Sequence, residues 1–201
     1  MGQVVVDITV SVDGYVTAPG ADLEHGLGVG GEPLHDWVMD GTDADRRVLD
    51  TAFHGTGAVV MGRRLFDIVD GPHGWRDDLG YGGEQDQSNP PPYFVVTHRA
   101  PETMRLRGDF TFVTDGVAAA VRQARAAAGE KTVVVMGGAD VCTQVVDAGL
   151  ADVVHLHVAP LLLGGGTRLF DHLPNAPVSL RIADVVSTPH ATHISYEVRN
   201  R

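Results

Sequence analysis

The segment from Val133 to Val141 reads VVVMGGADV. Its apolar, mostly β-branched start predicts a short buried strand at 133–136, and we expect a helix at 139–148. A strand that passes through two glycines directly into a helix points backbone N–H groups and the positive end of the helix dipole at one place. Glycine also lets a phosphate approach the main chain. The segment therefore predicts an α/β protein with an anion site at this junction, although a tight turn with nothing bound would look the same.

A second junction of the same kind reads AVVMGRRLFD at 58–67. Gly62 ends the expected strand, and Arg63 and Arg64 fall in the first turn of the next helix, where the helix dipole disfavours cations. A bound anion would relieve this conflict; otherwise the arginines face solvent or pair with nearby aspartates such as Asp67. Two such junctions in one chain favour a ligand with several phosphates.

A third candidate is Thr97-His98-Arg99, which ends and follows the expected strand at 93–97. The carboxyl ends of parallel strands meet at one edge of a sheet, where ligands bind. We therefore expect Gly62, Thr97 and Gly137 to share that edge. Arg99 is then placed to meet an additional phosphate, unless it lies in an exposed turn.

Strands and helices alternate through the middle of the chain, which is typical of an α/β fold with a largely parallel sheet. The expected strands are 3–12, 58–61, 93–97, 110–113, 133–136, 152–160, 178–187 and 192–198, and the expected helices are 44–54, 63–69, 116–128 and 139–148. The last two strands are predicted to close the sheet as an antiparallel hairpin. At 201 residues, we predict a single domain, 1–201, with three layers and a mixed, mostly parallel sheet. Residues 70–92 are expected to form a long binding loop or lid.

The composition excludes several classes of protein. Apolar residues make up 43% and charged residues 20%, as in globular domains, and no apolar run reaches the roughly 18–20 residues of a membrane helix. The net charge of −11 opposes binding to nucleic-acid phosphates. No signal peptide is visible. The single cysteine, Cys142, excludes an internal disulfide and is expected to be buried and inert; a cytoplasmic location fits best.

Four motifs in order carry a family resemblance over nearly the whole chain. They are SVDGYV (11–16), VMGRR (60–64), MGGADV (136–141) and PLLLGGGTRLF (160–170). Together they resemble the dihydrofolate reductase superfold, and more closely the reductase domain of the bacterial bifunctional riboflavin-biosynthesis deaminase-reductase. The resemblance implies an NADPH-dependent oxidoreductase that reduces a C=N or C=O bond of a small heterocycle, pterin- or pyrimidine-like. It also implies a homodimer formed through the last strands.

The resemblance also implies which residues hold NADPH. The dinucleotide phosphates would lie at Gly62, Arg63, Gly137, Gly138, Ala139, Asp140 and Val141. Thr97 and Arg99 would face the adenosine end with its 2′-phosphate, and Thr9, Val10 and Val16 would lie beside the nicotinamide. The family usually offers a hydroxyl where this chain has Leu65, so that phosphate contact is either missing or replaced by Arg64.

The substrate side is less defined. Folate-reducing relatives carry an acid on the helix before the second strand, but none of Asp43, Asp45 and Asp50 fits its spacing, which argues against dihydrofolate. The zinc deaminase signature of the bifunctional enzyme is absent. Asp13 is the candidate catalytic group near the pocket, with an Asp-Gly turn as the alternative. We expect Tyr15 and Trp37 to stack on a flat ring, or else to fill the core, and Gly165 to lie in a substrate-side loop, or else in a wide turn.

Two histidines alternate on one expected strand, His155 and His157. They could seed a metal site with His172 or His193, but no spaced carboxylates accompany them, so we expect no metal and favour a polar strip at a subunit contact or on the sheet surface. A non-catalytic nucleotide- or flavin-binding protein on the same fold is the alternative to the reductase.

Overall fold

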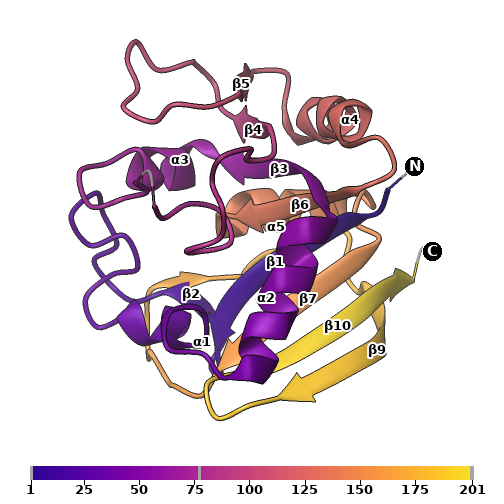
Figure 1. Ribbon diagram of the computed structural model, residues 1–201. Helices are drawn as coiled ribbons and strands as arrows, with labels where there is room; N and C mark the ends of the chain where they lie inside the picture. The colour runs from indigo at the N-terminus through magenta and orange to yellow at the C-terminus, as the bar shows by residue number, and fades with distance from the viewer. Residues whose placement is uncertain (1, 77, 200–201) are drawn as a thin grey trace.

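The computed structural model describes residues 2–76 and 78–199. An eight-stranded sheet lies at its centre, in the order β5-β4-β3-β6-β1-β7-β10-β9 (Figure 1). Six neighbouring strands are parallel: β1 (Val4–Ser11), β3 (Thr56–Gly62), β4 (Tyr93–Val96), β5 (Phe110–Val113), β6 (Thr132–Gly137) and β7 (Val153–Ala159). The last two, β9 (Ser179–Ser187) and β10 (Thr192–Arg199), form an antiparallel hairpin on the β7 side. The predicted mixed, mostly parallel α/β fold is therefore confirmed.

Helices cover both faces of this sheet. They are η1 (Glu32–His35), α1 (Asp36–Met39), α2 (Asp43–Gly55), α3 (Arg63–Val69), α4 (Val117–Ala128) and α5 (Ala139–Asp147). Figure 1 shows α2 in front of β1 and β7, with α5 behind the sheet. Side chains alternate along the strands: Val60 packs in one core cluster with residues of α4 and α5, whereas Met61 packs in another with Phe66 of α3. β3 therefore buries both of its faces, which explains its continuous apolar run in the sequence.

The start of α2 follows directly from local sequence. Thr42 is its N-cap, and Thr42 and Asp45 form a reciprocal capping box, which satisfies two of the free N–H groups at the helix start. The Thr42 backbone N–H donates to Asp45 Oδ2 at 2.7 Å. This box turns the Asp45 side chain back toward the helix start and inward, where it is fully buried.

A small second sheet was not predicted. It pairs β2 (Tyr15–Thr17) with β8 (Thr167–Arg168) in antiparallel fashion, and the Arg168 guanidinium lies 4.5 Å from the centre of the Tyr15 ring. Strands of two or three residues are too short to show a two-residue periodicity in sequence. Their pairing depends on contacts between residues about 150 positions apart, and it joins the 11–16 motif to the 160–170 motif.

No helix within residues 2–76 and 78–199 is both long and apolar enough to cross a membrane.

Candidate functional site

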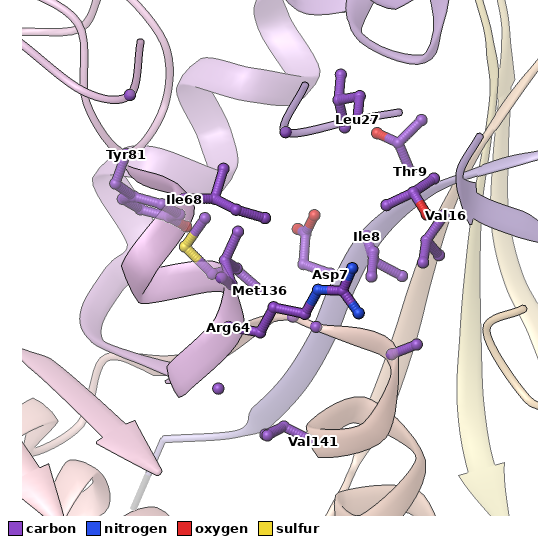
Figure 2. Close-up of a pocket in the computed structure, with 18 of the residues that line it drawn as sticks. Asp7, Ile8, Thr9, Val16, Leu27, Arg64, Ile68, Tyr81, Met136 and Val141 are labelled. Atoms are coloured by element: carbon purple, nitrogen blue, oxygen red, sulfur yellow. The ribbon is translucent and has the colours of Figure 1, made fainter. Parts of the chain in front are cut away.

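A cavity of about 1000 Å³ opens at the carboxyl edge of the parallel strands (Figure 2). Gly62 ends β3, Thr97 follows β4 and Gly137 ends β6. All three residues line the cavity. Ligand pockets span about 300–1000 Å³, so this cavity has room for a dinucleotide together with a small second ligand. The three strand ends therefore meet at one edge, as their positions in the sequence predicted.

The outer part of the cavity is built from backbone and glycine. Gly137 has a φ of +132°, a conformation that side-chain-bearing residues rarely adopt. Gly138 is the N-cap of α5, and the first three residues of that helix, Ala139, Asp140 and Val141, line the same wall. The free N–H groups of a nine-residue helix therefore begin at the cavity.

Three arginines border this outer part and differ in how they are paired. Arg63 Nε forms an ion pair with Asp67 Oδ1 at 2.7 Å, and Arg63 Nη1 donates to the carbonyl of Arg99. Arg99 is paired with exposed Glu102. Arg64 donates to the carbonyl of Ala21 at 2.6 Å and forms no ion pair with any residue in 2–76 or 78–199. Figure 2 shows its guanidinium extended into the cavity, where its charge is free for an anion.

Part of the segment at 70–92, expected to be a long loop, forms one side of the cavity. Its lining residues are His73, Gly74, Trp75, Leu79, Gly80, Tyr81, Gly82 and Gly83. Tyr81 is buried, and its hydroxyl group is hydrogen-bonded to the hydroxyl group of Thr56. The centres of the Trp75 and Tyr93 rings lie 5.5 Å apart. These anchors join the loop to β3 and β4, so the wall is held by the sheet.

The inner part of the cavity is polar, and β1 and β7 supply it. Asp7 and Thr9 on β1 pair in register with His155 and His157 on β7. Since alternate residues point to the same face, these side chains share the face under α1 and α2. Asp7, Thr9, Trp37 and His157 all line the cavity, and Figure 2 shows the Asp7 carboxylate turned into it.

A buried chain of hydrogen bonds leads away from Asp7. Asp7 Oδ1 lies 2.9 Å from His157 Nε2, the two Nδ1 atoms of His157 and His193 lie 2.7 Å apart, and His193 Nε2 lies 2.8 Å from Asp45 Oδ1. His157 is 3% exposed, His193 6% and Asp45 0%. For His157 the favoured interpretation, a polar strip at a subunit contact or on the sheet surface, is therefore wrong. His155 stays half-exposed, but His157 is covered by β10 and by Trp37, whose ring lies 4.3 Å away.

Both carboxylates of this chain stay ionised. Burial acts to raise the pKa of Asp7, but the charge of His157 and the contacts with His155 and His157 outweigh it and hold that pKa well below its usual range. At Asp45, burial is likewise outweighed by hydrogen bonds from Thr42, His193 and Thr188, which lower the pKa to about 2. Within residues 2–76 and 78–199, no group of three or more His, Cys, Asp or Glu has the arrangement of a metal site.

The residues expected at the site divide into two sets. Those that line the cavity are Thr9, Val16, Trp37, Gly62, Arg63, Arg64, Thr97, Arg99, Gly137, Gly138, Ala139, Asp140 and Val141. Val10, Asp13, Tyr15 and Gly165 are not among the lining residues; Val10 lies in the core. Sequence reasoning missed Asp7 and His35, both of which line the cavity, because an acid within a β-branched strand reads as a solvent-facing position.

Asp13 instead connects the turn after β1 to the loop that precedes β8. Its carboxylate accepts hydrogen bonds from the Ser11 hydroxyl at 2.6 Å and from the backbone N–H groups of Leu163 and Gly164. The hydrogen bond from Ser11 is the largest cause that lowers the pKa of Asp13 to about 2, and those from Gly164 and Leu163 follow in size. This placement favours the turn interpretation of Asp13. Cys142 is fully buried, and burial raises the pKa of its thiol to about 12.

The fold is that of the dihydrofolate reductase-like α/β proteins. A family model described as the RibD C-terminal domain matches residues 3–194. The chain therefore belongs to the RibD C-terminal domain family, and this membership implies a reductase. A search of curated proteins finds no match to this chain.

Solved structures agree with this assignment at the level of fold. A Shewanella sp. PV-4 protein provisionally assigned to riboflavin biosynthesis aligns with a TM-score of 0.69 and 22% identity over 98% of this chain and 99% of its own. A pyrimidine reductase-like protein from Corynebacterium diphtheriae gives 0.62 and 15% over 100% and 93%. A Thermotoga maritima diaminohydroxyphosphoribosylaminopyrimidine deaminase/5-amino-6-(5-phosphoribosylamino)uracil reductase gives 0.63 and 14%, with this chain covering 57% of that protein.

Proposed function

We propose that this protein is a cytoplasmic, NADPH-dependent oxidoreductase that reduces a C=N or C=O bond of a small heterocyclic substrate, using residues 1–201 as one domain. Membership of the RibD C-terminal domain family supports the reductase class. The cavity at the carboxyl edge of the sheet supports a dinucleotide as the cofactor, because this edge is where open α/β sheets bind such ligands.

The observation that carries the proposal is the empty space beside Gly138. Its φ of −72° is ordinary, and a Cβ built there would meet no protein atom within 4 Å. Packing within the protein therefore does not require glycine at this position. A ligand that approaches the main chain at the start of α5 would require it.

In this proposal the chain holds the dinucleotide along its outer cavity. Gly62 and the start of α5 (Gly137 to Val141) would hold the pyrophosphate, whose charge the backbone N–H groups and Arg64 would compensate. Thr97 and Arg99 face the adenosine end and its 2′-phosphate, and Thr9 and Val16 border the nicotinamide. When bound, the reduced dinucleotide supplies a hydride to the substrate.

The inner cavity suits a flat ring. Trp37 lines it and is held in place because its Nε1 donates to Thr9 Oγ1 at 2.9 Å. A fixed indole face is a good surface for stacking a pterin or pyrimidine ring. Two structural relatives are described as a pyrimidine reductase-like protein and a deaminase/reductase of a uracil derivative, so the pyrimidine type is the first choice.

The test is a calorimetric titration of the full chain with NADPH, NADH and FMN. We expect NADPH to bind more tightly than NADH, and Gly138→Ala to weaken it by tenfold or more, roughly 1.4 kcal/mol, with no loss of thermal stability. Gly55→Ala is the matched control, since a Cβ there also meets nothing within 4 Å. Binding of FMN but not NADPH would support the flavin alternative, and binding of neither would overturn the proposal.

We also propose that the protein is a homodimer formed through its β9–β10 face. Leu180, Ile182 and Val185 of the edge strand β9 are 42%, 60% and 49% exposed, and an apolar edge strand needs a cover. Ile182→Lys should halve the mass measured by sedimentation, whereas Leu162→Lys, at a loop position 73% exposed, should not. A monomeric wild type would disprove this part.

A further inference from the structure

The two buried histidines can be assigned protons from their geometry. An ionised carboxylate only accepts hydrogen bonds, so the Nε2 of His157 carries a proton toward Asp7 and the Nε2 of His193 carries one toward Asp45. The two Nδ1 atoms then face each other at 2.7 Å. Without a proton between them, two lone pairs would lie in contact, so a third proton occupies that space.

This count gives the histidine pair one positive charge. Three protons on two rings make one imidazolium and one imidazole, shared through the Nδ1–Nδ1 hydrogen bond. Burial, together with the charge of His157, lowers the pKa of His193 in spite of Asp45, which keeps the second ring neutral. With two carboxylates, the set of Asp7, His157, His193 and Asp45 carries a net charge of −1 and holds one mobile proton.

Only one end of this set reaches the cavity. Asp7 and His157 line it, whereas His193 and Asp45 lie behind them and are closed off by Trp37 and by the capping box of α2. Thr188 on the β9–β10 turn donates to Asp45 Oδ1 at 2.7 Å and completes its shell. A path of hydrogen bonds therefore connects the proton shared by His157 and His193 to the carboxylate of Asp7, which lines the cavity.

We propose that Asp7 contacts the substrate and that His157, His193 and Asp45 form a proton relay that supplies it. The proposal rests on the proposed function and adds the source of the proton, which that function leaves open. Asp7 is the catalytic residue of this relay. His157, His193 and Asp45 are positioning residues, since they act through Asp7.

The relay accounts for the proton in a balanced reduction. The carbon of a C=N bond receives a hydride, with its two electrons, from the reduced nicotinamide dinucleotide. The π electron pair moves to nitrogen and forms an N–H bond with a proton from Asp7. That proton comes from His157 Nε2, while the shared proton moves from His193 Nδ1 to His157 Nδ1. The set then changes from −1 to −2 and regains a proton from water through half-exposed His155, whose Nδ1 lies 3.6 Å from Asp7 Oδ2.

Other titratable groups face this set from each neighbouring element. They are His155 of β7 beside Asp7, His35 of η1, and Tyr81 and Cys142. The charge of Asp7 acts to raise the pKa of both Tyr81 and Cys142, and both groups are neutral at pH 7. Desolvation and the charge of His157 both lower the pKa of His35, although part of its surface is exposed to solvent. His35 is thus a neutral neighbour at pH 7 and adds no charge to the set.

The first test needs no substrate. Nitrogen-15 NMR of the histidine rings in the full chain, from about pH 5 to about pH 8, should show the Nδ1 atoms of His157 and His193 sharing one proton in the wild type. Asp7→Asn should move that proton onto His193, and His193→Gln should leave His157 neutral. His190→Gln, on the nearby turn, is the control. Two unprotonated or two protonated Nδ1 atoms at pH 7 in the wild type would overturn the relay.

The second test uses NADPH oxidation with the pyrimidine or pterin that the wild type reduces fastest. We expect Asp7→Asn and His193→Gln to lower kcat by roughly 10²-fold or more, as loss of a positioned acid does, and to change its pH profile while KM for NADPH stays within about twofold. Unchanged kcat and pH profile in His193→Gln would overturn the relay. A wild type that does not bind NADPH would overturn the proposed function instead, and the NMR result would separate the two failures.

Discussion

Asp45 of α2 and His193 of β10 lie 148 positions apart in the chain and are joined by a 2.8 Å hydrogen bond between Oδ1 and Nε2, both side chains being buried. This bond ties the helix before β3 to the hairpin at the end of the chain. The same carboxylate also caps α2 through Thr42. One acid therefore supports a helix start, a sheet edge and the orientation of His193.

Replacing that acid should destabilise the fold. Asp45→Asn turns an amide NH₂ toward the Thr42 N–H and hydroxyl, which already donate to Oδ2, so buried donors lose their acceptor at a cost of about 1–3 kcal/mol. Denaturant unfolding measures this loss. Asp43→Asn, whose carboxylate is exposed and pairs with Arg46, is the control and should change stability little.

The acid dependence of stability should follow the same residue. The unfolded chain protonates Asp45 near its ordinary pKa of 3.8, while the folded protein resists protonation down to about 2. The contribution of Asp45 is therefore full above about pH 4 and is lost as pH falls toward 2. Asp45→Asn should show a shallower fall in stability across that window; an unchanged slope would contradict the lowered pKa.

Arg64 should contribute to phosphate binding with little effect on folding. Its guanidinium reaches into the cavity. Within the fold it donates a solvent-exposed hydrogen bond to the backbone carbonyl of Ala21. Arg64→Gln should raise the Kd for NADPH about 10- to 100-fold, since a hydrogen bond to a charged group is worth about 1.5–3 kcal/mol. Arg122→Gln, on the exposed side of α4, should bind as the wild type; equal Kd values for both variants would remove Arg64 from the site.

The ion pair between Arg99 and Glu102 should limit discrimination between NADPH and NADH. Both side chains are mostly exposed, and such pairs are worth at most about 1 kcal/mol. Glu102→Gln frees Arg99 for a 2′-phosphate, so affinity for NADPH should rise by up to about fivefold while that for NADH stays the same. Glu130→Gln is the control. An equal rise for both dinucleotides would place Arg99 away from the 2′-phosphate.

Asp13 should prove to be a loop anchor. Asp13→Asn keeps one acceptor oxygen for two backbone donors, Leu163 and Gly164, so Tm should fall while the Kd for NADPH does not change. Asp115→Asn at an exposed position is the control. A large loss of kcat at unchanged Tm would restore the catalytic assignment of Asp13.

Most elements could be predicted because their signals are local. Thr42 as the N-cap of α2 and the helix 63–69 follow from residues a few positions apart. The meeting of Gly62, Thr97 and Gly137 at one cavity could also be predicted, because parallel strands place their carboxyl ends together whatever their exact order. The β2–β8 pair could not, since two- and three-residue strands carry no pattern.

The α/β alternation, the closing hairpin and the glycine junctions at the sheet edge can all be predicted from the amino-acid sequence, because each depends on periodicity or on backbone freedom within about ten residues. The meeting of His157 and His193, the place of Asp45 behind them and the orientation of Asp7 toward the cavity follow from the three-dimensional fold. These contacts depend on the order and register of β1, β7 and β10. A shift of one residue would turn every one of these side chains to the opposite face, and no local pattern specifies that register.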